Sequence, residues 1–327
     1  MKNGYFVISL DFELMWGVRD TQTKESYGEN ILGVKSAICE MLKIFNRYDI
    51  NATFAIVGFL FHKSKEELLN NIPDLVPSYT NKKLSPYSSI ETEIGNDEKD
   101  DPYFFGSSSI AAIRKSPNHE IATHTYCHYY CMEEGQNKKQ FEQDLNKAFE
   151  VGHEKGFSFK SIVFPRNQTN IEYLEICKKY GIESYRGNEK GFIYSPKSYD
   201  KETKLVRILR LLDSYFNITG FHCYDIQDIK KSFPFNIPSS RFLRPFSRKL
   251  FFLEKLKLIR IKNAMTYAAK NNLVYHLWWH PHNFGVNLER NINMLNEILT
   301  HYVYLNGRYN FESVTMFDLS NKLKKTK

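Results

Sequence analysis

Residues that could bind a metal ion are concentrated in two short stretches of the chain. The stretch HEIATHTYCHYYC at 119–131 contains three histidines and two cysteines, and SLDFE at 9–13 contains two acids. In the first stretch, His124 and His128 have the spacing H-x-x-x-H, which one helical turn or a tight turn would bring onto one side. Two imidazoles and a carboxylate form the usual ligand set of catalytic zinc, which keeps a fourth position for water. A hydrolytic metal site is therefore one interpretation of these stretches.

The cysteines offer a competing interpretation, a structural zinc site that includes Cys127 and Cys131. Such a site would fill all four coordination positions and leave none for catalysis. A helix continuing past His124 would also turn Cys127 away from the face that carries His128. The five cysteines of the chain are odd in number and irregularly spaced, so we expect buried thiols and no disulfide framework.

The two acids Asp11 and Glu13 lie two positions apart at the end of an apolar segment. In a strand, alternation would point both side chains to the same face. Two carboxylates buried together repel each other and lose hydration, and a cation is the natural group to offset both costs. The alternative is a pair of solvated loop acids, which the apolar neighbours Phe12, Leu14 and Trp16 disfavour.

The elements that must position these residues alternate between strand and helix patterns. This alternation favours a mainly parallel sheet, open or closed into a barrel. In such folds ligands bind at the carboxyl ends of the strands, where Asp11, Glu13, His124, Arg166 and His280 are expected. Strands are predicted at 4–13, 52–61, 119–125, 161–167, 181–187 and 272–281, and helices at 31–45, 138–155, 171–180, 288–305 and 315–323.

The chain is expected to form one domain over 1–327, with insertions near 72–106 and 187–262. A hydrophobic content of 42% is that of a folded globular protein. The sequence contains no run of 18 apolar residues, so no membrane-spanning helix is predicted. The apolar start of the chain is short and interrupted by Asp11, which is unlike a signal peptide, so we expect a cytoplasmic protein.

Basic residues are concentrated between Lys230 and Lys262, where ten Lys or Arg accompany one acid, Glu254. Such a segment suggests an anionic partner, and the alternative is a solvated basic face or a core-facing helix with its lysines outward. Arg241 and Arg244 suit phosphate, because arginine makes bidentate contacts. We expect peripheral contact of 230–262 with an anionic membrane, at its inner face, and no nucleic-acid binding, because no nucleic-acid motif is present.

Five motifs together resemble the polysaccharide deacetylase family, which has a NodB homology domain and is also called carbohydrate esterase family 4. SLDFE resembles its first motif, NATFAIVG its second strand and HEIATHTYCH its H-[ST]-x-x-H motif. FPRNQ resembles its arginine motif and HLWWHPH its late histidine motif. The motifs follow the family order from residue 9 to residue 282. The resemblance implies an α/β fold, a distorted (β/α) barrel of about seven strands with surface insertions.

The same resemblance implies a metal-dependent hydrolase that removes an N-acetyl or similar acyl group from an amino sugar. The family's roles transfer to Glu13, His124 and His128 as metal ligands, Asp11 as catalytic base, Arg166 as the residue that orients this base, and His280 as general acid. The implied cofactor is a divalent ion, with zinc expected and cobalt, nickel or iron as alternatives.

Two features depart from the family pattern. Phe12 separates Asp11 from Glu13, whereas the family usually has two adjacent aspartates, so either acid could be the base. The late motif offers His276, His280 and His282 as general acids. We favour His280, because the following proline marks it as the end of its strand.

The substrate is expected to be an amino-sugar glycan or a nucleotide- or lipid-linked sugar in surface-polysaccharide biosynthesis. Two other hypotheses are an amidase of the same family acting on a small non-sugar amide or ureide, and an inactive module that binds sugar or membrane. Tryptophans near strand ends could stack on sugar rings, although such residues more often pack in the core. The expected substrate-binding residues are Trp16, Trp279, Arg241, Arg244 and His282.

Overall fold

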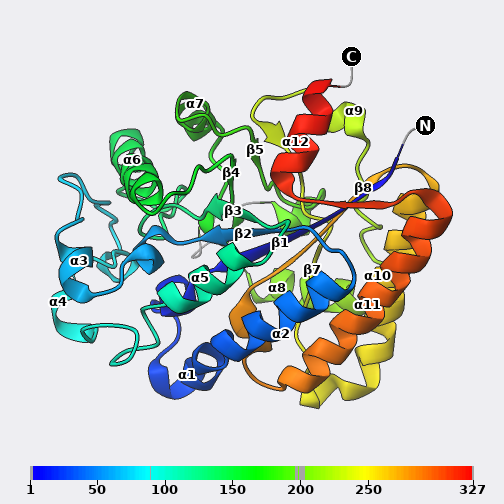
Figure 1. Ribbon diagram of the computed structural model, residues 1–327, viewed down its shortest axis with the longest axis horizontal. Coiled ribbons are helices and arrows are strands. Elements are labelled where there is room, and N and C mark those ends of the chain that lie inside the picture. Colours follow the sequence, from blue (N-terminus) through cyan, green and yellow to red (C-terminus); the bar gives the residue numbers. More distant parts are fainter. Residues whose placement is uncertain (1–2, 89, 196–197, 199–202, 326–327) are drawn as a thin grey trace.

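A parallel sheet forms the centre of the computed structural model, which describes residues 3–88, 90–195, 198 and 203–325 (Figure 1). The strands follow the order β6-β5-β4-β3-β2-β1-β8-β7, and β9 also pairs with β1. All pairings between these strands are parallel. The strands are β1 (Tyr5–Phe12), β2 (Ala52–Ile56), β3 (Glu120–Thr123), β4 (Ser161–Ile162), β5 (Ser184–Tyr185), β6 (Phe235–Asn236), β7 (Arg241–Phe242), β8 (Val274–Trp279) and β9 (Glu312–Val314).

The two ends of the strand order are joined by one short segment of chain. Backbone N–H groups of Ile237 and Ser239 donate to the carbonyls of Tyr185 and Gly187 on the β5 side. The next N–H group, that of Ser240, donates to a carbonyl of β8. The segment between β6 and β7 therefore closes the sheet into a distorted barrel, the architecture that the family resemblance implied, with nine strands in place of about seven.

Helices surround the barrel, as Figure 1 shows. Helix α2 illustrates why they pack there, because its buried residues repeat every three or four positions and form one apolar stripe. The helices are α1 (Lys24–Leu32), α2 (Val34–Arg47), α3 (Lys65–Leu69), α4 (Ile90–Glu93), α5 (Ser107–Lys115), α6 (Lys138–Glu154), α7 (Ile171–Lys179), α8 (Lys204–Tyr215), α9 (Ile226–Ile229), α10 (Glu254–Lys270), α11 (Leu288–Tyr309) and α12 (Met316–Lys325). No helix of the described part of the chain is long and apolar enough to span a membrane.

The central strands are buried along almost their whole length. Every residue of β8 is buried, and in β1 only Tyr5 is partly exposed. A parallel strand that is covered on both faces has a continuous hydrophobic run. That run ends at the carboxyl edge of the sheet, where polar side chains replace apolar ones.

The regions expected as insertions contribute to the fold in different ways. The end of the region 72–106 contacts the chain that follows β1, where the Trp16 indole N–H donates to the Phe104 carbonyl at 2.9 Å. Residue 89 of that region lies outside the described residues. The region 187–262 supplies β6, β7 and the first half of α10, so part of it belongs to the barrel itself. Residues 196–197 and 199–202 of that region lie outside the described residues. The assignment of 1–327 to one domain stays a prediction.

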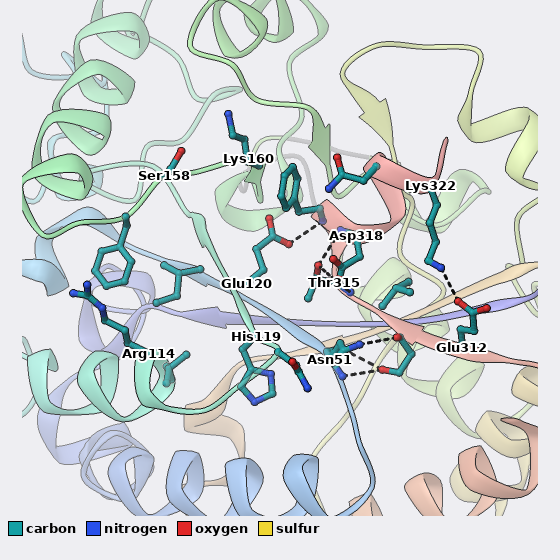
Figure 2. A pocket seen from close by; sticks show the side chains of 18 of the residues that line it. Asn51, Arg114, His119, Glu120, Ser158, Lys160, Glu312, Thr315, Asp318 and Lys322 are labelled. Atoms are coloured by element: carbon teal, nitrogen blue, oxygen red, sulfur yellow. Dashed lines mark hydrogen bonds and ion pairs between the residues drawn. The ribbon is translucent and has the colours of Figure 1, made fainter. Parts of the chain in front are cut away.

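A depression of about 960 Å³ lies at the amino ends of β2, β3 and β9 (Figure 2). Its side chains fasten neighbouring elements: Asn51 donates to the Ser313 carbonyl at 2.9 Å, and Lys322 pairs with Glu312 at 2.7 Å. Active sites of parallel barrels lie at the opposite, carboxyl edge. We therefore read this depression as structural.

Candidate metal and active site

The polar residues at the carboxyl edge of the barrel come together around one cavity of about 360 Å³. Asp11 and Glu13 come from the end of β1, and His128 from the loop after β3. His280 and His282 come from the end of β8 and also line the cavity. The structure thus brings together side chains that are far apart in the sequence.

Glu13, His124 and His128 form a buried group that fits a divalent metal ion. The Glu13 Oε2 atom lies 3.0 Å from His128 Nε2 and 3.4 Å from His124 Nε2. One ligand atom from each residue falls within 4.8 Å of the others. Burial lowers the pKa of His128 to about 4, so its ring is neutral at pH 7, the form that binds metals. The donor set is the one expected of a catalytic zinc site.

Contacts behind this group fix its orientation. The His124 Nδ1 atom lies 2.8 Å from the Val163 carbonyl, so Nε2 faces Glu13. Such a second contact selects the tautomer of a metal-binding histidine. Gly17 lies against the Glu13 carboxylate, and a Cβ atom at this position would approach the carboxylate carbon to 2.0 Å. A glycine is required here because no side chain fits beside the carboxylate.

The loop that carries His128 is an irregular turn, not a helix. Thr125 and His128 both have left-handed backbone conformations, with φ of 63° and 62°. Backbone strain of this kind is concentrated at functional sites. The carboxylate of Asp144, from α6, accepts the backbone N–H groups of Tyr126 and Cys127 at 2.8 and 3.0 Å. Asp144 therefore holds the loop in the shape that places His128.

Asp11 is held by Arg186 and not by Arg166, which corrects the prediction. The Arg186 guanidinium donates to both Asp11 carboxylate oxygens, at 2.7 and 2.6 Å, and both side chains are buried. Burial opposes ionisation of Asp11, but attraction to Arg186 outweighs it and the pKa of Asp11 lies below its ordinary value. Asp11 is therefore a carboxylate at neutral pH.

Arg166 lies in a tight turn after β4 and points to other partners. Its φ is 54°, it pairs with Asp20, and its guanidinium lies 4.3 Å from the centre of the Tyr130 ring. The following residue, Asn167, accepts an N–H of Arg186 at 2.8 Å. The FPRNQ motif therefore positions the arginine beside Asp11 through Asn167, and Arg166 lines the cavity.

Among the three late histidines, His280 lies closest to the carboxylates of Asp11 and Glu13. Its Nε2 atom lies 3.7 Å from Asp11 Oδ2 and 3.5 Å from Glu13 Oε1, and its side chain is 22% exposed. His276 is fully buried behind this layer, with Nε2 at 2.8 Å from the Ser9 hydroxyl. His282 lies 3.9 Å from Glu13, and Glu13, His280 and His282 form a second group that could hold a metal.

Trp16 and Trp279 do not line the cavity, which corrects their assignment as substrate-binding residues. Trp16 is 1% exposed and packs edge-on against Phe59, and Trp279 is completely buried. Neither ring has a face that a sugar could contact. The neighbouring Trp278 does line the cavity, and its ring lies 4.1 Å from the Arg186 guanidinium. Alternation along β8 turns Trp278 toward the cavity and Trp279 into the core.

The basic residues of 230–262 are partly turned inward. Arg241 and Arg260 both pair with the buried Asp213, at 2.7 and 2.8 Å. Lys257 is buried and donates to the Arg244 carbonyl at 3.0 Å. Helix α10 does have the apolar inner face of the core-facing alternative, with Lys255 and Lys270 exposed, but Lys257 and Arg260 are buried instead of pointing outward.

The cysteines do not take part in the candidate metal site. Cys127 and Cys131 are buried free thiols. Burial raises the pKa of both well above the ordinary value, so neither is a thiolate at pH 7. Among the described residues, the groups that could hold a metal consist only of Glu13 and pairs of histidines. The structural zinc interpretation is therefore not supported.

Two residues of the site were missed in the sequence. Arg186 lies in GIESYRG, directly after β5, as His280 lies directly after β8. Its position at a strand end was the available signal. Trp278 is adjacent to Trp279 in HLWWHPH, and only the alternation along β8 distinguishes the two side chains.

The comparisons with known proteins support the fold. No protein-family model matches the chain, and no curated protein sequence matches it. A solved structure assigned as a polysaccharide deacetylase from Mycobacterium smegmatis is 11% identical, with a TM-score of 0.62, over 99% of this chain and 91% of that one. A second solved structure assigned as a polysaccharide deacetylase, from Pseudomonas aeruginosa PAO1, is 10% identical, with a TM-score of 0.57. The match covers 98% of this chain and 91% of that one.

A 4-alpha-glucanotransferase from Thermococcus litoralis shares the architecture too, at 12% identity and a TM-score of 0.52, over 98% of this chain and 41% of that one. Enzymes of different activity therefore have related folds, and the reaction must be argued from the site. At these identities the similarity shows one thing plainly: the chain has the fold of the NodB-like polysaccharide deacetylases.

Proposed function

We propose that the protein is a metal-dependent hydrolase that removes an N-acetyl or similar acyl group from an amino sugar. The observation that carries this proposal is the adjacency of two units at one cavity. One unit is the Asp11–Arg186 ion pair, and the other is the buried group of Glu13, His124 and His128. A fixed carboxylate beside a metal-binding group suits base-assisted attack of water on an amide.

Each residue has a role in this reaction. A divalent ion bound by Glu13 and the two histidines would polarise the amide carbonyl and acidify the attacking water. Asp11 accepts the proton of that water, and Arg186 keeps the Asp11 carboxylate ionised and aimed. His280, on the other side of the cavity, donates a proton to the nitrogen of the leaving amine.

The walls of the cavity fit a sugar ring better than a long apolar chain. Phe242 and Trp278 line it, and their ring centres lie 4.7 Å apart. Aromatic faces of this kind pack on the apolar faces of sugars, while Asn167 and Asn283 offer amide groups to hydroxyls. A role in surface-polysaccharide biosynthesis, a cytoplasmic location and contact of 230–262 with a membrane stay predictions.

The first test is metal analysis of the purified protein beside single variants. We expect bound metal near one equivalent in the wild type and in the matched control His153→Ala, which changes an exposed histidine of α6. His124→Ala and His128→Ala should lose most of the metal. His282→Ala should keep it, because we assign the ion to the other group. Equal metal in all variants would remove the basis of the proposal.

The second test is release of free amine from N-acetylated sugars by the same samples. Asp11→Asn should keep the metal and lose turnover by roughly 10²-fold or more, because a positioned base contributes that much. Activity on cyclic amides and none on N-acetylated sugars would favour the small-amide hypothesis. Metal binding without any amine release would favour an inactive binding module.

A further inference from the structure

A second cavity, of about 340 Å³, adjoins the first one. The two share part of their walls, so a ligand can extend from one into the other. The shared residues are Arg166, Asn167, Phe242, Trp278 and His280. A sugar that places its acyl group near Asp11 would therefore direct another part of the substrate into the second cavity.

The second cavity is strongly basic. Among the described residues that line it are four arginines and one acid, Glu189. Two of these arginines already have carboxylate partners, since Arg166 pairs with Asp20 and Arg241 with Asp213. Asp213 is shared with a further arginine of α10, so its charge is divided between two cations. The four arginines are Arg166, Arg210, Arg241 and Arg244.

Arg244 is the cation whose charge is least compensated. Within the described part of the chain it has no carboxylate partner, and its guanidinium lies 5.7 Å from the Phe242 ring centre. Burial, together with the nearby Arg241 and Arg210, lowers the pKa of Arg244. The Nη2 atom of Arg241 is also buried, and no described atom accepts a hydrogen bond from it. Arg244 is partly buried, and withdrawing a cation from water without a counter-charge is costly, so an anionic ligand would offset that cost.

We propose that this second cavity, the arginine cavity, binds a phosphate group carried by the substrate sugar. The inference rests on the proposed function, because the sugar would occupy the first cavity. Phosphate carries up to two charges and several acceptor oxygens, so it can pair with more than one guanidinium. A single sugar carboxylate would need only one. The phosphate could come from a nucleotide carrier or a lipid carrier, and the chemistry recognised is the same.

The test uses metal-stripped protein, because phosphate also binds zinc directly. Calorimetric titration with inorganic phosphate then reports the arginine cavity alone. We expect Arg244→Ala to weaken phosphate binding by about tenfold or more, the loss expected for a charge-assisted hydrogen bond. The matched control Arg47→Ala, at the exposed end of α2, should bind phosphate like the wild type. Arg244→Lys should restore part of the affinity.

Other probes define what would overturn the proposal. Tighter binding of glucuronate than of phosphate, or equal phosphate affinity in wild type and Arg244→Ala, would contradict it. Uridine diphosphate and geranyl phosphate then distinguish the two carriers, and tighter binding of either supports a phosphate subsite. His124→Ala should lose metal and amine release while phosphate affinity is unchanged. Failure of the deacetylase proposal is thus separable from failure of the arginine cavity.

Discussion

The ion pair between Asp11 and Arg186 is the contact on which the proposed reaction depends most. Both side chains are buried, and the guanidinium donates to both carboxylate oxygens. Arg186 is itself held by Asn167 at 2.8 Å and by the Ser9 hydroxyl at 2.9 Å. Because each donor has a partner, the carboxylate of Asp11 has one fixed direction, which faces the cavity.

Replacing Arg186 should therefore affect both catalysis and stability. We expect Arg186→Ala to lower amine release by roughly 10²-fold or more and to lower the free energy of unfolding by about 3–5 kcal/mol, because it leaves Asp11 buried without a partner. Steady-state kinetics and denaturant unfolding measure the two effects. Arg186→Lys keeps the charge but not the bidentate contact, so it should recover stability more than activity. Wild-type turnover in Arg186→Ala would contradict the assigned role of Asp11.

The sequence identified most residues of the site for a physical reason. Asp11, Glu13 and His280 lie at the ends of β1 and β8, whose residues are mostly apolar, and the change to polar residues marks the end of a buried strand. His124 follows the short strand β3, and its signal was the spacing to His128. Arg186 follows β5, which has only two residues and no such run. Its partner is 175 positions away, and nothing local to either residue announces the contact. A contact between residues this far apart in the chain cannot be predicted from local sequence patterns.

The conformation of the loop after β3 depends on one side chain of helix α6. The Asp144 carboxylate accepts the N–H groups of Tyr126 and Cys127, the two residues between the left-handed Thr125 and the left-handed His128. Gly58 lies against the same loop, and a Cβ there would approach Tyr126 to 2.4 Å. The loop is therefore clamped from α6 and from the end of β2.

Asp144→Asn should weaken metal binding without unfolding the protein. The amide keeps one acceptor oxygen, but its NH₂ group faces a backbone N–H, so one loop contact is lost. We expect the metal dissociation constant to rise by about 10–100-fold, as for other supporting contacts behind metal ligands. Competition with a chelator measures this constant. Glu150→Gln, on the exposed side of α6, should behave like the wild type, and unchanged affinity in Asp144→Asn would show that the loop holds its shape alone.

Helices α8 and α10 and strand β7 are joined through Asp213. Its carboxylate pairs with Arg241 and Arg260 and also accepts the N–H groups of Ile218 and Thr219. Breaking such a buried network by removing the charge costs about 3–5 kcal/mol. We therefore expect Asp213→Asn to lower the free energy of unfolding by that amount, measured in urea at pH 7.

The pH dependence of this effect has a definite sign. Burial raises the pKa of Asp213, but Arg241, together with hydrogen bonds, outweighs burial, and the pKa lies well below the ordinary value. A carboxyl group whose pKa is lowered by folding stabilises the folded state at pH values above its pKa in the unfolded chain, about 3.9. That stabilisation is lost as the pH falls toward the lower pKa of the folded state. The difference between wild type and Asp213→Asn should stay constant from pH 5 to 8 and shrink below about pH 4. A gap that widens in acid would contradict this account.

In the fold, the long helices could be predicted from the sequence pattern, whereas the shortest strands could not. Helices α6, α7 and α11 have strong periodicity and were predicted within a few residues of their bounds. Strands β6 and β7 have two residues each, which is too short for a period of two to be visible. They were placed in an insertion at 187–262, although they close the barrel. Closure depends on backbone pairing with β5 and β8, which no local pattern reports.

For the whole molecule, the candidate metal site connects parts of the chain that only the closed barrel brings together. Glu13 and His128 are 115 positions apart, and their side chains are in contact only in the folded state. A ligand that binds the folded state alone stabilises it by mass action. The site should therefore couple metal content to global stability as well as to turnover.

Removal of the metal should accordingly lower the melting temperature. At free metal about 100-fold above the dissociation constant, binding contributes about 2.7 kcal/mol, which corresponds to a shift of a few degrees for a chain of this size. Thermal unfolding with EDTA, and after zinc is restored, measures that shift. His153→Ala should show it, whereas His128→Ala should show none, because the variant lacks a ligand in the folded state. An equal shift in both variants would show that the stabilising ion does not need His128, which would contradict the assigned ligand set.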